Sequence, residues 1–223
     1  MASTWGMLIF LGIRFYRSMY TDEGYLSHTL PVTANQLFLS KILVSGVWYL
    51  FISIGIGISV VALVVSLMTG LLNIGELSSV LTQYNGNIWE FLADAFYELG
   101  RTYEEEMGVN LLHYGITLLL TYVVGPFITM VTLFGALTIG QLSSKHKGFM
   151  GILAYAGVTI LSSIIGSTVQ SAFMFGTNVM SSQSGISVNA NSAYDINVIT
   201  SLLLAAIMYG VSYYIMNKKL NLD

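Results

Sequence analysis

Four long stretches without a charged residue constrain this chain more than any other feature of its sequence. They cover residues 42–75, 107–144, 148–194 and 196–217. A helix needs about 20 consecutive apolar residues to cross a bilayer core about 30 Å thick, and each stretch is long enough. Charged residues make up 9% of the chain, whereas a typical soluble domain has about 25%. The pattern predicts an all-α, multi-pass transmembrane helical bundle, and it excludes a soluble enzyme and a nucleic-acid binder with a basic face.

Polar residues at the ends of these stretches predict four full spans, at residues 42–72, 110–143, 149–176 and 196–216. The segments predicted outside the bilayer are 14–41, 73–109, 177–195 and 217–223. Residues 1–13 are uncharged, but thirteen residues of helix reach only about 20 Å. We expect them to be a partial N-terminal span, the end of a longer helix. A short interfacial or re-entrant segment is the alternative.

Local signals predict the helix ends and their shapes. Thr33 and Gln36 have the spacing of a capping box, which predicts a helix that starts at Ala34 and runs into the membrane. Pro126 follows Gly125 inside the second span and predicts a kink. Within 76–106, apolar and charged residues alternate at helical spacing and predict one extracellular amphipathic helix. Its apolar side would carry Ile88, Leu92, Ala95, Phe96 and Leu99, and its polar side Glu90, Asp94, Glu98, Arg101 and Glu105.

The basic residues are divided unequally between the two predicted sides of the membrane. Seven of the eight fall in segments 14–41, 145–147 and 218–223, namely Arg14, Arg17, Lys41, Lys145, Lys147, Lys218 and Lys219. The other side has only Arg101. Lys and Arg in short loops mark the cytoplasmic side. The sequence therefore predicts a cytoplasmic C-terminus.

Motifs for chemistry are absent from the sequence. There is no phosphate-binding loop, no cysteine and no metal-ligand spacing among His28, His113 and His146. The four spans contain no Asp, Glu, Lys or Arg, although ion-coupled pumps usually bury such residues within their spans. We expect no catalytic residue, no metal site and no cofactor in this chain. An intramembrane enzyme is disfavoured, and a transporter driven from outside the membrane is favoured.

One polar face stands out in the third span. Ser163, Ser167 and Ser171 are spaced by four residues, with Gln170 beside them. Small polar residues at this spacing occur where helices pack closely in membranes. The second interpretation is that this face lines a translocation path.

The segment from residue 14 to 41 reads RFYRSMYTDEGYLSHTLPVTANQLFLSK. It resembles the cytoplasmic segment of exporter-type, ABC-2-like ABC transporter permeases of Gram-positive bacteria, which have an aromatic and basic stretch, a D-E-G-Y-L run and then T-L-P-V. The resemblance extends as a pattern over the chain: a span, an acidic outer segment, two spans joined by a short basic turn, a polar outer loop, a last span and a basic tail.

The resemblance implies a function. Such permeases usually have six spans, two of them before this segment, and the segment docks on a separate ATPase subunit. It implies a coupling role for Asp22, Glu23, Gly24, Tyr25, Leu26 and Pro31. It also implies a cell-membrane location in a bacterium, a second permease subunit of the same or a different sequence, and ATP and Mg²⁺ bound by the ATPase. The alternative function is a multi-pass membrane anchor or sensory partner that transports nothing.

Overall fold

The computed structural model describes residues 2–21, 33–72, 84, 87–107, 111–143, 146–184 and 191–218. These residues form six helices and no strand, so the all-α prediction is confirmed. In chain order the helices are α1 (Ala2–Tyr20), α3 (Ala34–Leu72), α5 (Ile88–Met107), α6 (Leu111–Gly140), α7 (Lys147–Ser184) and α8 (Asn191–Lys218).

Four of these helices are long and apolar enough to cross a membrane. Their apolar parts are Asn35–Leu67 in α3, Leu112–Gly140 in α6, Lys147–Gly176 in α7 and Asp195–Asn217 in α8. The last three ranges lie close to the predicted spans, and the first begins and ends a few residues earlier than predicted. The predicted helical bundle with four membrane-spanning helices is confirmed.

The N-terminal helix is longer than the predicted partial span over 1–13. Helix α1 continues through Arg14 and Arg17 to Tyr20. Both arginines are exposed, and arginine is a good helix former, so the charges end the apolar stretch without ending the helix. The side of α1 that faces the bundle is buried at every third or fourth position, at Leu8, Leu11, Phe15 and Met19.

The predicted polar loop over 177–195 is also shorter than expected. Helix α7 continues to Ser184, and α8 already begins at Asn191. The polar residues end the apolar part of α7 at Gly176 but not the helix itself. Serine and threonine fit in a helix when the hydroxyl bonds to a carbonyl one turn earlier. In α7, for example, Ser171 Oγ donates to the Ser167 carbonyl oxygen at 2.7 Å.

Helix α3 begins at the predicted capping box. The Gln36 backbone N–H donates to Thr33 Oγ1 at 3.3 Å, and the Thr33 N–H donates to Gln36 Oε1 at 3.1 Å. This reciprocal pair satisfies two backbone donors that have no partner within the helix. The 39 residues of α3 extend about 58 Å, well beyond a hydrocarbon core about 30 Å thick.

The buried core lies at one end of the bundle and joins three helices through aromatic rings. Phe15 of α1 stacks on Phe134 of α6, with ring centroids 4.0 Å apart and planes 5° apart. Phe38 of α3 meets Phe15 edge-on at a centroid distance of 5.9 Å. Phe38 and Phe134 are completely buried. We call this the packed end. Each such pair contributes about 0.5–1.5 kcal/mol beyond its buried area.

Glycine allows the backbones of α6 and α7 to touch near the packed end. A Cβ atom on Gly140 would lie 2.4 Å from the Cα atom of Gly151, closer than any real contact. A Cβ atom on Gly46 of α3 would likewise lie 2.4 Å from the ring of Phe127. These two contacts hold α7 and α3 against α6, as small residues do in membrane bundles.

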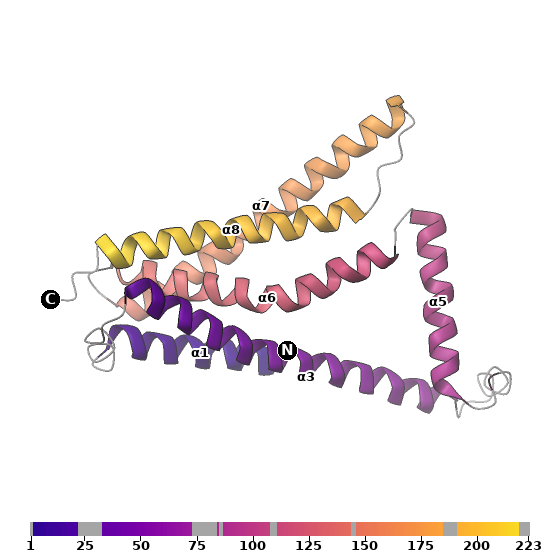
Figure 1. The fold of residues 1–223 in the computed structure, drawn as a ribbon, viewed down its shortest axis with the longest axis horizontal. Coiled ribbons are helices and arrows are strands. Elements are labelled where there is room, and N and C mark those ends of the chain that lie inside the picture. The colour runs from indigo at the N-terminus through magenta and orange to yellow at the C-terminus, as the bar shows by residue number, and fades with distance from the viewer. Residues whose placement is uncertain are drawn as a thin grey trace.

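The helices spread apart toward the opposite end, which we call the splayed end (Figure 1). There α7 diverges from α8, and α3 diverges from α6. Helix α5 runs across this end, between the end of α3 and the start of α6 (Figure 1). Its aromatic residues Trp89, Phe96 and Tyr97 are exposed, and Phe96 belongs to the predicted apolar side. Aromatic side chains of this kind favour the membrane–water interface.

The described basic residues outside α5 lie toward the packed end. They are Arg14 and Arg17 in the second half of α1, Lys41 in the first quarter of α3, Lys147 at the start of α7 and Lys218 at the end of α8. The acidic residues of α5 lie at the splayed end. The fold therefore separates charge along the bundle in the way that the predicted arrangement of spans requires.

Candidate functional site

Two adjoining cavities lie between the membrane-spanning helices. The first, which we call the tyrosine cavity, measures about 480 Å³ and lies among α3, α6, α7 and α8. Its polar lining consists of Tyr49, Ser53, Tyr114, Thr117, Thr121, Tyr122, Thr129, Gln170 and Asn197. Across it the Tyr122 hydroxyl donates to the backbone oxygen of Ser53 and so links α6 to α3.

The second cavity lies among α6, α7 and α8 and measures about 510 Å³. We call it the serine cavity. Its polar lining consists of Thr129, Thr132, Tyr155, Thr159, Ser162, Ser163, Ser167, Gln170, Asn197, Thr200 and Ser201. Residues of both α7 and α8 line this cavity, and α7 diverges from α8 toward the splayed end (Figure 1).

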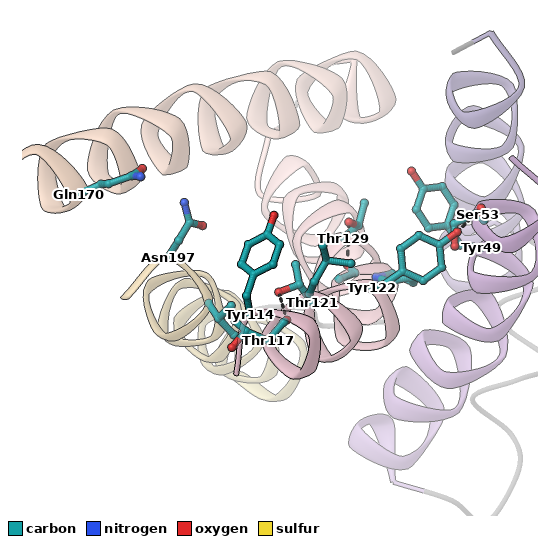
Figure 2. A pocket seen from close by; sticks show the side chains of 13 residues that line it. Tyr49, Ser53, Tyr114, Thr117, Thr121, Tyr122, Thr129, Gln170 and Asn197 are labelled. Carbon is teal, nitrogen blue, oxygen red and sulfur yellow. Dashed lines mark hydrogen bonds between the residues drawn. The ribbon is translucent and has the colours of Figure 1, made fainter. Parts of the chain in front are cut away.

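Three residues line both cavities: Thr129 of α6, Gln170 of α7 and Asn197 of α8. Figure 2 shows Gln170 and Asn197 pointing into the space between α7 and α8, with the Tyr114 ring directed toward the same space. The two cavities therefore form one continuous surface along the inside of the splayed half. We refer to it as the groove.

None of the residues that line the groove is charged. Most of its hydroxyl groups donate to carbonyl oxygens of their own helices. Ser163 Oγ donates to the Thr159 oxygen at 2.9 Å, and Thr200 Oγ1 donates to the Ile196 oxygen at 2.7 Å. Such bonds allow serine and threonine within a membrane span. These hydroxyls keep lone pairs that can accept a hydrogen bond, but their protons are already in use.

The side-chain amides of Gln170 and Asn197 differ from the hydroxyls. They are the only amide side chains in the groove, and neither forms a hydrogen bond with a described residue. Each amide offers two N–H donors and one oxygen acceptor. Gln170 is half-buried and Asn197 is exposed toward the groove. The groove therefore has free hydrogen-bonding capacity at the junction of its two cavities.

A small polar cluster joins α6 to α8 beside the tyrosine cavity. His113 Nε2 lies 2.9 Å from Asp195 Oδ2 and 3.0 Å from Asp195 Oδ1. Thr117 Oγ1 donates to Asp195 Oδ1 at 3.2 Å. Since Thr117 also lines the tyrosine cavity, this cluster marks its end toward α5. His113 lies at the boundary of the apolar part of α6.

The structure places part of the predicted polar face of α7 in the groove. Ser163, Ser167 and Gln170 line the serine cavity, whereas Ser171 does not. Ser163, Ser167 and Ser171 are all exposed, so this face of α7 does not pack tightly on a neighbour. The predicted coupling residues Asp22, Glu23, Gly24, Tyr25, Leu26 and Pro31 lie outside the described residues.

Sequence reasoning missed the walls formed by α6 and α8, although their spacing is visible in the sequence. Asn197, Thr200 and Ser201 recur on α8 with the period of a helix, and Thr117, Thr121 and Thr129 recur on α6. Each set is the polar stripe of an otherwise apolar span.

No group of His, Asp or Glu side chains within the described ranges has the geometry of a metal site. Comparison of the chain with protein families, with curated proteins and with solved structures gives no match.

Proposed function

We propose that this chain is the membrane-spanning subunit of an ABC-type exporter, powered by ATP hydrolysis in a separate ATPase subunit. The observation that carries the proposal is the uncharged groove, whose hydroxyl and amide groups lie within the four membrane-spanning helices. A groove of this composition offers a substrate a polar path without a carboxylate or a basic side chain that could carry a coupling proton. This favours a transporter driven from outside the bilayer.

The shape of the bundle supports the same proposal. Alternating access requires a path that is closed on one side of the membrane and open on the other. The aromatic core closes the packed end, and the groove lies in the splayed half. This corresponds to one of the two states of such a cycle. The basic packed end is the end that we assign to the cytoplasm, where the ATPase would bind.

The connection between α1 and α3 is where we expect the ATPase to act. Both flanking helices are anchored in the core, where Phe15 of α1 stacks on Phe134 of α6 and Phe38 of α3 meets Phe15 edge-on. A force applied to residues 22–31 would therefore reach α6, which forms a wall of both cavities. In this proposal Asp22 and Glu23 pair with basic groups of the ATPase, and Tyr25 and Leu26 fill an apolar pocket on it.

The experiment is a pull-down of the ATPase encoded next to this gene by full-chain permease variants in detergent. Glu23→Lys replaces an attraction with a repulsion, and Tyr25→Ala removes an anchor. For a buried pair the loss is about 2–5 kcal/mol, so recovery of the ATPase is expected to fall at least tenfold. Both variants should insert into the membrane normally because neither lies in a span.

Glu98→Lys on α5 is the matched control, because it makes the same change of charge at the opposite end of the bundle. It should leave recovery of the ATPase unchanged. Equal recovery with wild type, Glu23→Lys and Tyr25→Ala would refute the coupling role and favour a membrane protein that works without an ATPase.

A further inference from the structure

We infer that the serine cavity binds an uncharged amphiphile that carries an amide or hydroxyl group, and that Gln170 and Asn197 hold that group. This deepens the proposed function, on which it rests for its physiological role, by naming the class of substrate. The binding step itself belongs to this chain alone and can be measured without an ATPase.

The hydrogen-bonding groups of the cavity select the polar part of the ligand. Because Ser163 and Thr200 already donate within their helices, the free N–H donors that face the cavity come from Gln170 and Asn197. A ligand amide or hydroxyl both donates and accepts, so it can satisfy these amides and the open lone pairs of the hydroxyls together. Polar groups held at membrane depth are costly until they are paired.

The absence of charge from the cavity lining excludes ionised ligands. A carboxylate or an ammonium group would lose its hydration at membrane depth and would meet no counter-charge among the lining residues. The cost of burying an ion without a partner is several kcal/mol. A neutral polar group avoids this cost, which is why the inference is limited to uncharged ligands.

The apolar part of the ligand follows from the remaining lining and from the position of the cavity. Ile128, Val158 and Leu204 line it beside the polar groups. Ser163 and Ser167 line the cavity and are exposed, so the cavity is open to its surroundings within the apolar part of α7. A molecule dissolved in the bilayer can reach it directly. A volume of about 510 Å³ accommodates a small head group with part of a chain.

Gly166 gives direct control over access to this cavity. It lines the serine cavity, and a Cβ atom added there would meet no atom within 4 Å. Gly166→Leu therefore starts its side chain in open space, and we expect that side chain to occupy part of the cavity while both amides are retained. Gly157 lies on the same helix, is equally open to a Cβ atom and does not line either cavity, so Gly157→Leu is its matched control.

The test is photolabelling of the full chain in nanodiscs with dodecanamide that carries a diazirine on its alkyl chain. Two further probes have the same chain, one ending in a methyl group and one in a trimethylammonium group. We expect the amide probe alone to label residues of α7 and α8 around the serine cavity, in a manner that excess plain dodecanamide prevents. Peptide mass spectrometry locates the labelled residues.

Variants of the cavity test whether this labelling depends on the amides of Gln170 and Asn197. Loss of two hydrogen bonds at membrane depth in Gln170→Leu/Asn197→Leu should reduce saturable labelling roughly five- to tenfold. Gly166→Leu should reduce it at least as much, and Gly157→Leu should not change it. Equal labelling by the amide and methyl-ended probes, preference for the charged probe, or an unchanged signal in Gly166→Leu would each overturn the inference.

The outcome is separable from that of the ATPase pull-down. Saturable amide labelling without any bound ATPase would leave the ligand class standing and refute the exporter. A bound ATPase without amide labelling would support the exporter and refute the ligand class.

Discussion

At the scale of single residues, glycines allow helix backbones to touch, and polar side chains line the groove. Gly140 and Gly151 bring two backbones together where no larger residue fits, whereas Gly157 and Gly166 on the same α7 helix face open space. Glycines that look alike in the sequence therefore have opposite roles, and only the neighbouring helix distinguishes them.

This difference predicts the cost of adding one methyl group. Gly140→Ala places a Cβ atom against the Gly151 backbone, so α6 and α7 must separate, and we expect a loss of about 1–3 kcal/mol in the free energy of unfolding. Gly157→Ala should change it little or raise it slightly, since alanine is the better helix former. Unfolding by SDS titration from detergent micelles measures both. An equal effect of the two substitutions would contradict the α6–α7 contact.

At the scale of helices, α6 is the element that the others share, because it packs against α3, α7 and α8. Near its middle, buried Pro126 removes a backbone donor, and α6 changes direction between the packed and splayed halves (Figure 1). Toward α5, the cluster of His113, Thr117 and Asp195 ties α6 to α8 again.

A double-mutant cycle tests the tie between α6 and α8. His113 and Asp195 are 50% and 37% exposed, and pairs in contact with solvent contribute at most about 1 kcal/mol. We expect His113→Ala and Asp195→Ala each to lower stability slightly, with a coupling energy of a few tenths of a kcal/mol to about 1 kcal/mol. The same cycle on Arg101 and Glu105, which pair within α5 at 3.4 Å, is the control for a coupling energy confined to one helix. Fully additive effects of His113→Ala and Asp195→Ala would show that the contact does not couple the two helices.

The helices themselves were largely predictable, whereas their packing was not. Uncharged length predicted the four spans, and Thr33 and Gln36 predicted the start of α3, because both signals are local. The loop at 177–195 was predicted too long, because a polar run ends a membrane span without ending a helix. The sequence did not show which helix each face packs against, for a different reason. Lipid is as apolar as a neighbouring helix, so an all-apolar span does not reveal which side packs.

Only the α7 wall of the groove was predictable from the sequence. The spacing of Ser163, Ser167 and Gln170 drew attention to α7, but Asn197 was treated as part of an ordinary span. Its role depends on α8 lying opposite α7, which no local pattern encodes.

At the scale of the whole molecule, the bundle has opposite charge at its two ends, and its orientation in the membrane is open to direct measurement. We expect single cysteines at Ser27 and Ser144 to react only from the cytoplasmic side, and one at Ser184, the last residue of α7, only from the outside. The chain has no native cysteine, so each variant carries a single thiol. Reaction of the Ser27→Cys variant from outside would reverse the assignment of both ends.

The divergence of α7 and α3 also has a consequence for the surrounding lipid. A bundle that is narrow at the packed end and wide at the splayed end displaces unequal areas in the two leaflets (Figure 1). Drawing α7 back onto α8 would return area to one leaflet and not to the other. In the proposed transport cycle, lateral pressure in that leaflet would favour one shape over the other, so conical lipids and membrane curvature would act on the protein as ligands do.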